Sequence, residues 1–242
     1  MYNLSRAIPP EIKREIRKNS GFGCIICGTA IVEYDHVDPE FKYAKEHDSN
    51  KMTLLCPNCH SKKTRKFLSK ETILEYMRNP ITKKQGFSQD CLDLDLSKPL
   101  IVKIGNCTFE DVHIPIMMSS IPLITILRPE ENSKYAILSA KFYDCSGNNT
   151  LIIQNNEWKA SSDVWDLEVT SGRIYIKENS ELRLSIKNEG RNIFNVEYLE
   201  TLINGTHVKT TPNGIVINAP DSGIQNINIS VNAKGGYIGL SL

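Results

Sequence analysis

The sequence predicts an α+β protein made of two regions, on three observations. Two Cys-x-x-Cys pairs and short helical patterns lie in the first third of the 242 residues. After Pro99, runs rich in Ile, Val, Leu and Tyr recur between Gly, Asn, Asp and Pro, without a helical pattern between them. The hydrophobic content of 40% is that of an ordinary folded protein. We therefore expect a small domain at residues 1–80, a linker at 81–98 and an all-β domain at 99–242.

Helical patterns flank the first region. Pro10 suits the first turn of a helix, because its missing N–H would be unpaired there in any case. Apolar residues one turn apart follow, and Ser20 with the next glycine ends the pattern. A second pattern runs from about His60. A third begins near Ser69 and ends at Pro80, which disfavours a helical residue before it.

Two short strands are expected between these helices. The run Ile31–Tyr34 predicts a strand that ends at Asp35 and His36, and Met52–Leu55 predicts a second one. With the helix that follows, the order is strand, strand, helix. A ββα unit of about 40 residues buries too little apolar surface to be stable alone. We therefore expect a metal to hold it together.

The cysteines provide such a metal site. Cys24 with Cys27, and Cys56 with Cys59, are two Cys-x-x-Cys turns whose four thiolates can fill the tetrahedral shell of zinc. A filled shell leaves no water on the zinc, so the zinc would be structural. The remaining cysteines stand alone in the sequence and are expected to be buried or half-buried: Cys91, Cys107 and Cys145.

The composition also indicates a compartment. No stretch of about 18 apolar residues is present, so we expect no membrane span. The first residues lack the apolar core of a secretory signal, which predicts a cytoplasmic protein. In that reducing compartment, paired Cys-x-x-Cys motifs hold metal more often than disulfides.

Charge is distributed unevenly along the chain. Residues 1–84 carry 16 Lys and Arg against 10 Asp and Glu, whereas residues 85–242 carry 13 against 18. A basic surface beside a metal site suits a polyanion such as nucleic acid, although it could also merely solvate a small domain. Four basic residues follow His60, and we expect them to contact phosphate: Lys62, Lys63, Arg65 and Lys66. The alternative is that they form a solvated face of the helix.

Alternation defines the second region. Leu182–Ile186 and Ile227–Val231 alternate apolar and polar residues, as do strands with one buried face. Other expected strands include Ile121–Leu127, Tyr135–Tyr143 and Ile193–Tyr198. Such strands suggest a sandwich or a stacked β-solenoid, and the lack of a strict repeat length favours the sandwich.

One set of motifs resembles the HNH, or ββα-metal, endonuclease family. The resemblance rests on Cys24-x-x-Cys27, the Asp35-His36 pair and Leu55–His60, and it covers about residues 6–70. It implies that Asp35 and His60 hold one divalent cation, magnesium or manganese, and that His36 is the general base. It also implies that the zinc knot fixes the angle between hairpin and helix.

Physical reasoning agrees with these roles. Adjacent strand residues point to opposite faces, so Asp35 and His36 serve different tasks. A hard cation prefers an oxygen ligand such as that of Asp35. An imidazole with a pKa of about 6.5 can take a proton from water at neutral pH. We expect cleavage to leave 5′-phosphate and 3′-hydroxyl ends.

The loop before the second strand departs from the family pattern. The family's middle asparagine falls near Lys51 here, with Asn50 one residue earlier. We expect Asn50 to brace the loop that carries His36, and His47 to be a solvated loop histidine.

The sequence thus favours a metal-dependent DNA endonuclease, with gating in a defence role as a hypothesis from family analogy. The β region would then bind a protein partner, a signal or a second copy of the chain. A zinc-stabilised nucleic-acid-binding module without catalysis is the main alternative. An interaction protein with a degenerate nuclease is another, which the intact Asp35, His36 and His60 disfavour.

Overall fold

The computed structural model describes residues 4–94, 98–127, 137–190 and 192–242. The chain divides into two compact units. Unit 1 comprises residues 1–90 and 159–168, and unit 2 comprises residues 91–158 and 169–242. All described α-helices lie in unit 1 and most strands lie in unit 2, which confirms the predicted α+β class.

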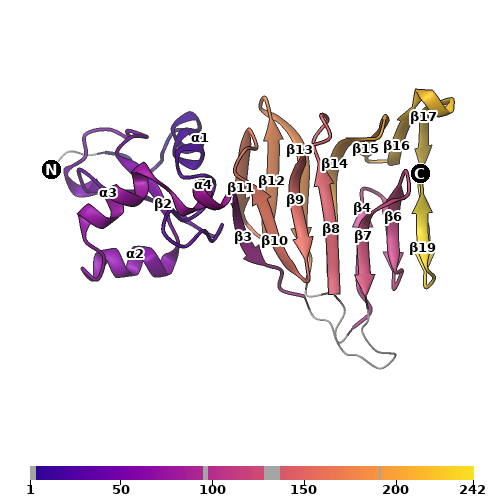
Figure 1. Cartoon of the computed structure of the whole chain (residues 1–242), viewed down its shortest axis with the longest axis horizontal. Helices are drawn as coiled ribbons and strands as arrows, with labels where there is room; N and C mark the ends of the chain where they lie inside the picture. The colour runs from indigo at the N-terminus through magenta and orange to yellow at the C-terminus, as the bar shows by residue number, and fades with distance from the viewer. Residues whose placement is uncertain (1–3, 95–97, 128–136, 191) are drawn as a thin grey trace. The chain divides into compact units, whose positions relative to one another are not determined.

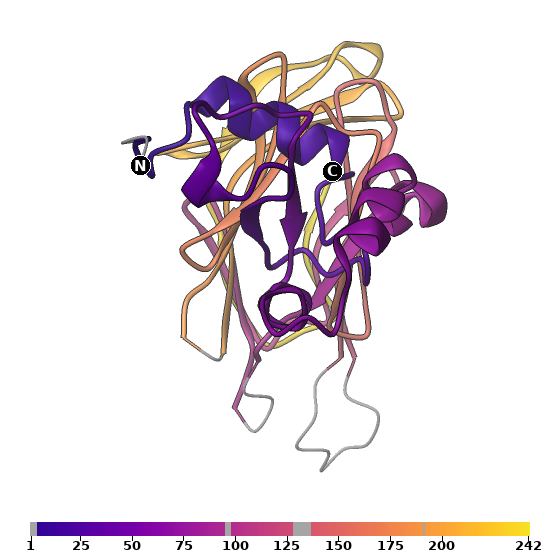
Figure 2. The ribbon, with the colours of Figure 1, turned by 90° about the vertical axis from the view of Figure 1, so that its left-hand side faces the viewer.

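Unit 1 contains a two-stranded hairpin and its helices (Figure 1). In chain order its main elements are α1 (Pro10–Asn19), β1 (Glu33–His36), η1 (Phe41–Tyr43), β2 (Met52–Leu55), α2 (Pro57–Thr64), α3 (Lys70–Arg78) and α4 (Ile81–Gln85). β1 and β2 are antiparallel, with Asp35 opposite Thr53 and His36 opposite Met52. Figure 2 looks along the axis of α2, which lies below the hairpin in that view.

Local sequence explains where the helices begin. Pro57 occupies the first turn of α2, and the Cys56 thiol caps it by accepting a hydrogen bond from the Cys59 N–H at 3.3 Å. α2 therefore starts at Pro57, ahead of the predicted start near His60. α3 begins as predicted, because the Ser69 hydroxyl accepts from the Thr72 N–H at 3.1 Å.

The core of unit 1 is small and includes its cysteines. One buried cluster packs three of them with apolar side chains: Cys24, Ile25, Val37, Leu55, Cys56, Cys59 and Ile73. A second cluster contains Ile16 from α1 with Met52 and Leu54 from β2. Both clusters draw on β2, all four residues of which are buried. A core of this size agrees with the expected need for a metal.

Much of the segment predicted as a linker, residues 81–98, has regular structure. α4 is followed by β3 (Phe87–Cys91). The Ile81 N–H donates to the Ile25 carbonyl at 2.9 Å, and the Thr82 hydroxyl donates to the Ser20 carbonyl at 2.6 Å. These long-range bonds order a segment whose composition gives no such signal. Residues 95–97 of the predicted linker lie outside the described residues.

Unit 2 is built from strands. Their bounds, with those of one 3-10 turn and of two strands shared with unit 1, are β4 (Ile101–Ile104), β5 (Cys107–Glu110), β6 (Ile114–Met118), β7 (Ile121–Leu127), β8 (Ile137–Tyr143), β9 (Asn149–Gln154), β10 (Glu157–Ser161), β11 (Asp166–Thr170), β12 (Arg173–Glu178), β13 (Glu181–Asn188), β14 (Ile193–Ile203), β15 (Thr206–Thr211), β16 (Gly214–Ala219), η2 (Pro220–Ser222), β17 (Ile224–Ile229), β18 (Asn232–Lys234) and β19 (Ile238–Ser241). β3, β10 and β11 each have residues in both units. Of the predicted strand Tyr135–Tyr143, Tyr135 and Ala136 lie outside the described residues.

The strands form two large sheets. One has the order β19-β6-β7-β8-β9-β10-β3, and the other runs from β11 to β17 in chain order, with β4, β5 and β18 attached. Chain neighbours such as β7 with β8 and β15 with β16 pair antiparallel, whereas coils of a solenoid stack in parallel. β8 and β14, from different sheets, contact each other, and each buries alternate residues. These features favour the sandwich over the solenoid.

Candidate functional site

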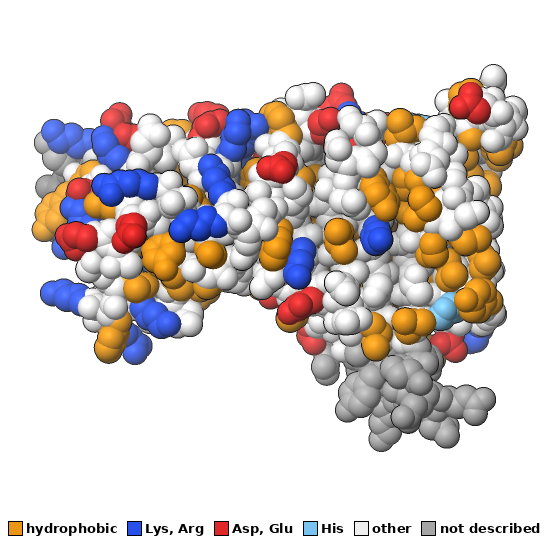
Figure 3. Space-filling view, in the orientation of Figure 1, with side chains coloured by type: hydrophobic (Ala, Val, Ile, Leu, Met, Phe, Trp, Pro, Cys, Tyr) orange, Lys and Arg blue, Asp and Glu red, His pale blue; other side chains and the backbone are white. Residues whose placement is uncertain are grey.

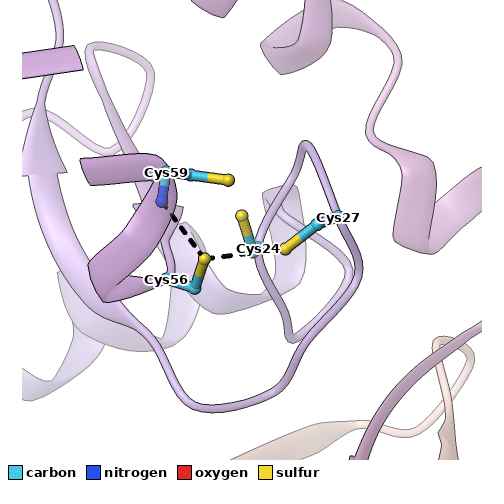
Figure 4. Close-up of side chains that lie close together, drawn as sticks. All are labelled: Cys24, Cys27, Cys56 and Cys59. Atoms are coloured by element: carbon cyan, nitrogen blue, oxygen red, sulfur yellow. Dashed lines mark hydrogen bonds between the residues drawn. The ribbon is translucent and has the colours of Figure 1, made fainter. Parts of the chain in front are cut away.

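Four cysteine sulfurs converge in unit 1. The Sγ atoms of Cys24, Cys27, Cys56 and Cys59 all lie within 4.8 Å of one another (Figure 4). Cys24 and Cys27 come from the loop after α1, and Cys56 and Cys59 come from the start of α2. Gly28 closes the first turn at a φ of +81°, a conformation that glycine adopts at little cost, and its N–H donates to the Cys24 carbonyl at 2.8 Å.

This donor set fits zinc. A tetrahedron with zinc–sulfur bonds of about 2.3 Å has edges of about 3.8 Å. The Sγ atoms of Cys27 and Cys56 lie 3.6 Å apart. A hydrogen bond from Cys27 lowers the pKa of Cys24 to about 5, whereas burial and the nearby Cys24 raise the pKa of Cys59 to about 12. Thiols with such different pKa values, three of them buried, ionise together most readily around a cation, which supports the predicted zinc knot.

Asp35 and His60 face each other beside α2. Asp35 is only 7% exposed, and its Oδ1 lies 3.2 Å from Nε2 of His60. The hairpin brings Asp35 to this point at the end of β1, and α2 brings His60. The two expected cation ligands are thus close together.

Glu33 holds the other side of the His60 ring. Its Oε2 lies 2.7 Å from Nδ1 of His60, so a neutral His60 donates from Nδ1 and keeps its lone pair on Nε2, beside Asp35. Sequence reasoning did not select Glu33. The available signal was its position two residues before Asp35, which puts both carboxylates on one face of β1.

The position of Lys63 shows that a positive charge fits beside Asp35. Its ammonium donates to Oδ2 of Asp35 and, at 2.7 Å, to the backbone carbonyl of His36. A positive charge thus lies against two oxygen atoms, which are the ligand type that magnesium and manganese prefer. Either ion would keep several waters besides two protein ligands. Lys63 is only 17% exposed and does not project toward solvent as the predicted phosphate contact requires.

His36 lies on the opposite face of β1 from Asp35, as the alternation predicts. It is 8% exposed, its Nε2 is 3.1 Å from Nδ1 of His47, and the Phe41 ring packs edge-on against it. Burial, then the neighbouring His47, lowers the pKa of His36 below its ordinary value of 6.5, and Lys63 acts in the same direction. The ring therefore stays neutral through physiological pH. It also lines a hollow in the surface with Pro39, Tyr43, Ala44, Lys45, Glu46, Asp48 and Lys51.

Unit 1 thus combines three features: a hairpin followed by a helix, a thiol cluster, and an Asp-His pair at the end of β1. Residues 24–66 match the family model of HNH endonucleases. No curated protein and no solved structure matches the chain. The HNH region includes both cysteine pairs together with Asp35, His36 and His60. The match indicates a nuclease-type or nucleic-acid-related function with a zinc site.

Basic side chains border the HNH region. Lys62, Arg65 and Lys66 are exposed on α2 and just after it, where phosphate can reach them. Figure 3 shows Lys and Arg side chains exposed over the helices of unit 1. Lys63 differs from its three neighbours because it points to Asp35.

The loop between β1 and β2 differs from expectation in two positions. Asn50 is exposed, and its backbone N–H donates to Oδ1 of Asp48 at 2.9 Å, while none of the described contacts joins its side chain to His36. His47, predicted to be solvated, is half-buried and hydrogen-bonded to His36.

None of the described helices is long and apolar enough to cross a membrane.

Proposed function

We propose that this protein is a metal-dependent HNH endonuclease that hydrolyses phosphodiester bonds of DNA in the cytoplasm. The observation that carries the proposal is the separation of Asp35 and His36 across β1. Asp35 meets His60 on one face, while His36 lines a surface hollow on the other. Because Asp35 and His36 are the last residues of β1, a phosphate placed at that end of the strand would meet the cation on one side and the base on the other.

Asp35 and His60 would hold magnesium or manganese, with Glu33 orienting the His60 ring. Bound there, the cation would neutralise charge on the phosphate and on the leaving oxygen. Lys63 would move off Asp35 to make room for it, and its ammonium would then be free to meet a phosphate.

His36 would take the proton from an attacking water, since its lowered pKa keeps the imidazole neutral. As the water O–H bond breaks, its electron pair forms the new bond to phosphorus. The bond from phosphorus to the 3′ oxygen breaks, and that oxygen takes a proton from solvent. The products carry 5′-phosphate and 3′-hydroxyl ends.

DNA would be held by the exposed cations Lys62, Arg65 and Lys66, which contact phosphates without reading sequence. Residues 85–242, which include all of unit 2, carry 13 Lys and Arg against 18 Asp and Glu, a balance that does not favour binding to phosphate. We propose that unit 2 binds a protein partner or a second copy of the chain and gates the nuclease, as a defence role would require.

Plasmid cleavage by the full chain tests the proposal. Supercoiled DNA would be incubated with magnesium or manganese, with an EDTA control, and with the variants His36→Ala and His113→Ala. We expect nicking or linearisation by the wild type and by His113→Ala, whose ring belongs to unit 2. EDTA and His36→Ala should abolish it. DNA binding without cleavage in any metal would contradict catalysis by the full chain and favour a zinc-stabilised binding module.

A further inference from the structure

A hydrogen-bonded chain connects His36 to the backbone near the start of the molecule. Nε2 of His36 lies 3.1 Å from Nδ1 of His47, and Nε2 of His47 lies 2.9 Å from the carbonyl oxygen of Ser5. The two imidazole rings are tilted, with centroids 5.2 Å apart. Both nitrogens of His47 are therefore engaged, one on each side of its ring.

With a neutral His47, the carbonyl at Ser5 sets the direction of both hydrogen bonds in this chain. A carbonyl oxygen only accepts, so Nε2 of His47 carries the hydrogen. A neutral His47 then has its lone pair on Nδ1, and Nε2 of His36 must donate to it. In a neutral His36 the lone pair therefore resides on Nδ1.

Nδ1 is also the ring atom of His36 that is left for chemistry. No hydrogen-bond partner of Nδ1 occurs in the described ranges 4–94, 98–127, 137–190 and 192–242, whereas Nε2 is occupied by His47. Phe41 packs edge-on against the ring at a centroid distance of 5.4 Å and limits its rotation. The basic nitrogen and the ring orientation are thus both defined by neighbours.

We propose that His47 is a positioning residue, which holds His36 in the Nε2–H tautomer so that Nδ1 accepts the proton from the attacking water. The inference rests on the proposed nuclease function and names a residue that acts through His36. When Nδ1 takes the proton, the bond from Nε2–H to His47 becomes a hydrogen bond from a cation, and it strengthens as the reaction proceeds. No atom of His47 gains or loses a proton in this step.

Kinetics of His47 variants separate positioning from simple loop packing. His47→Ala removes the acceptor, and we expect kcat to fall about 10- to 100-fold while KM changes little, the range seen for partners that orient metal-ligating imidazoles. His47→Asp restores an acceptor that cannot donate, and His47→Asn restores one without a charge. Both should recover most of the lost kcat although neither refills the volume of the ring. Equal losses in all three variants would show a packing role only.

The tautomer can be observed without any cleavage. The full zinc-loaded chain, labelled with ¹⁵N-histidine, has five histidines, and His36→Gln assigns the His36 signals. Above neutral pH we expect the wild-type His36 to show a protonated Nε2 and an unprotonated Nδ1, and His47→Ala to show a mixture of tautomers. A protonated Nδ1 in the wild type, or an unchanged spectrum in His47→Ala, overturns the proposal.

Plasmid cleavage distinguishes failure of the nuclease proposal from failure of the role proposed for His47. If the wild type does not cut DNA in any metal, the proposed function fails, and the catalytic role of His47 fails with it whatever the tautomer. If the wild type cuts DNA and His47→Ala cuts equally fast, only the role of His47 fails.

Discussion

The two units bury different kinds of polar side chain. In unit 1 the buried polar residues include ionisable ones, namely Arg17, Asp35, His36 and Asp166. In the described part of unit 2 they are all hydroxyl residues: Thr150, Ser185, Thr201, Thr206 and Thr210. Burying a charge costs far more than burying a hydroxyl, so buried charges are paired with each other or bind a metal. The buried ion pair and the candidate cation ligand Asp35 therefore both belong to unit 1.

Their sources of stability differ too. Unit 2 has large side chains that are fully buried, such as Phe109, Phe142 and Phe194. The clusters of unit 1 are smaller, and three of its buried side chains are cysteines. Unit 2 can therefore rely on apolar packing, whereas unit 1 needs a cation in addition. Loss of the metal should therefore unfold unit 1 and leave unit 2 folded.

Removal of a zinc ligand should have the largest effect. Cys59→Ser leaves three thiols, and because structural zinc contributes about 10 kcal/mol or more to small zinc folds, unit 1 should unfold while unit 2 stays folded. Zinc content and thermal unfolding by circular dichroism would be measured, with Cys145→Ser of unit 2 as control. If Cys59→Ser keeps both its zinc and its melting profile, the cysteine cluster is not the staple of unit 1.

Two bidentate ion pairs of the same form offer a second comparison. Arg17 donates to Asp166 at 2.9 and 2.6 Å, with side chains 9% and 4% exposed. Arg173 donates to Glu197 at 2.9 and 3.0 Å, with side chains 29% and 28% exposed. Only the first pair is shielded from water.

Substitution of each arginine should therefore differ in effect. Arg17→Met leaves Asp166 buried without a partner, which should cost about 3–5 kcal/mol of unfolding free energy. Arg173→Met should have a far smaller effect, because water and salt already screen that pair. Urea unfolding of both variants would measure the difference. Similar losses would mean that burial does not distinguish the two units in the way described.

The smallest effect is expected at Lys63. In the proposed site its ammonium would compete with the divalent cation for Asp35, so Lys63→Met should lower the magnesium concentration needed for half-maximal cleavage about fivefold, or roughly 1 kcal/mol. A magnesium titration of plasmid cleavage measures this, with Lys62→Met as the exposed neighbouring control. A higher magnesium requirement in Lys63→Met would mean that Lys63 assists the substrate and does not displace the metal.

Local features of unit 1 were predictable from the sequence. The cysteine spacing anticipates the thiol cluster, because two short turns can present four sulfurs to one point. The alternation of a strand anticipates that Asp35 and His36 separate. The hairpin and the helix after it were expected from apolar runs and a helical pattern, although β1 starts at Glu33 and α2 already at Pro57.

Contacts between distant segments were not predictable. The bond from His47 to the Ser5 carbonyl joins residues 42 positions apart, and neither residue has a neighbour that signals it. Lys63 belongs to a basic run whose members look equivalent until the hairpin is placed beside α2. The order of α4 depends in the same way on the carbonyls of Ser20 and Ile25. Each depends on tertiary packing, for which propensity and periodicity carry no signal.

The Arg17–Asp166 pair also determines when unit 1 can be completed during synthesis. Its two partners are separated by 149 positions, and both belong to unit 1. During synthesis, Arg17 can form this ion pair only after Asp166 has left the ribosome. Both cysteine pairs and the Asp-His pair emerge much earlier. The same pair makes residues 1–90 an incomplete unit when they are expressed alone, because residues 159–168 would be missing. Unit 1 is therefore completed only when more than half of the chain has been made.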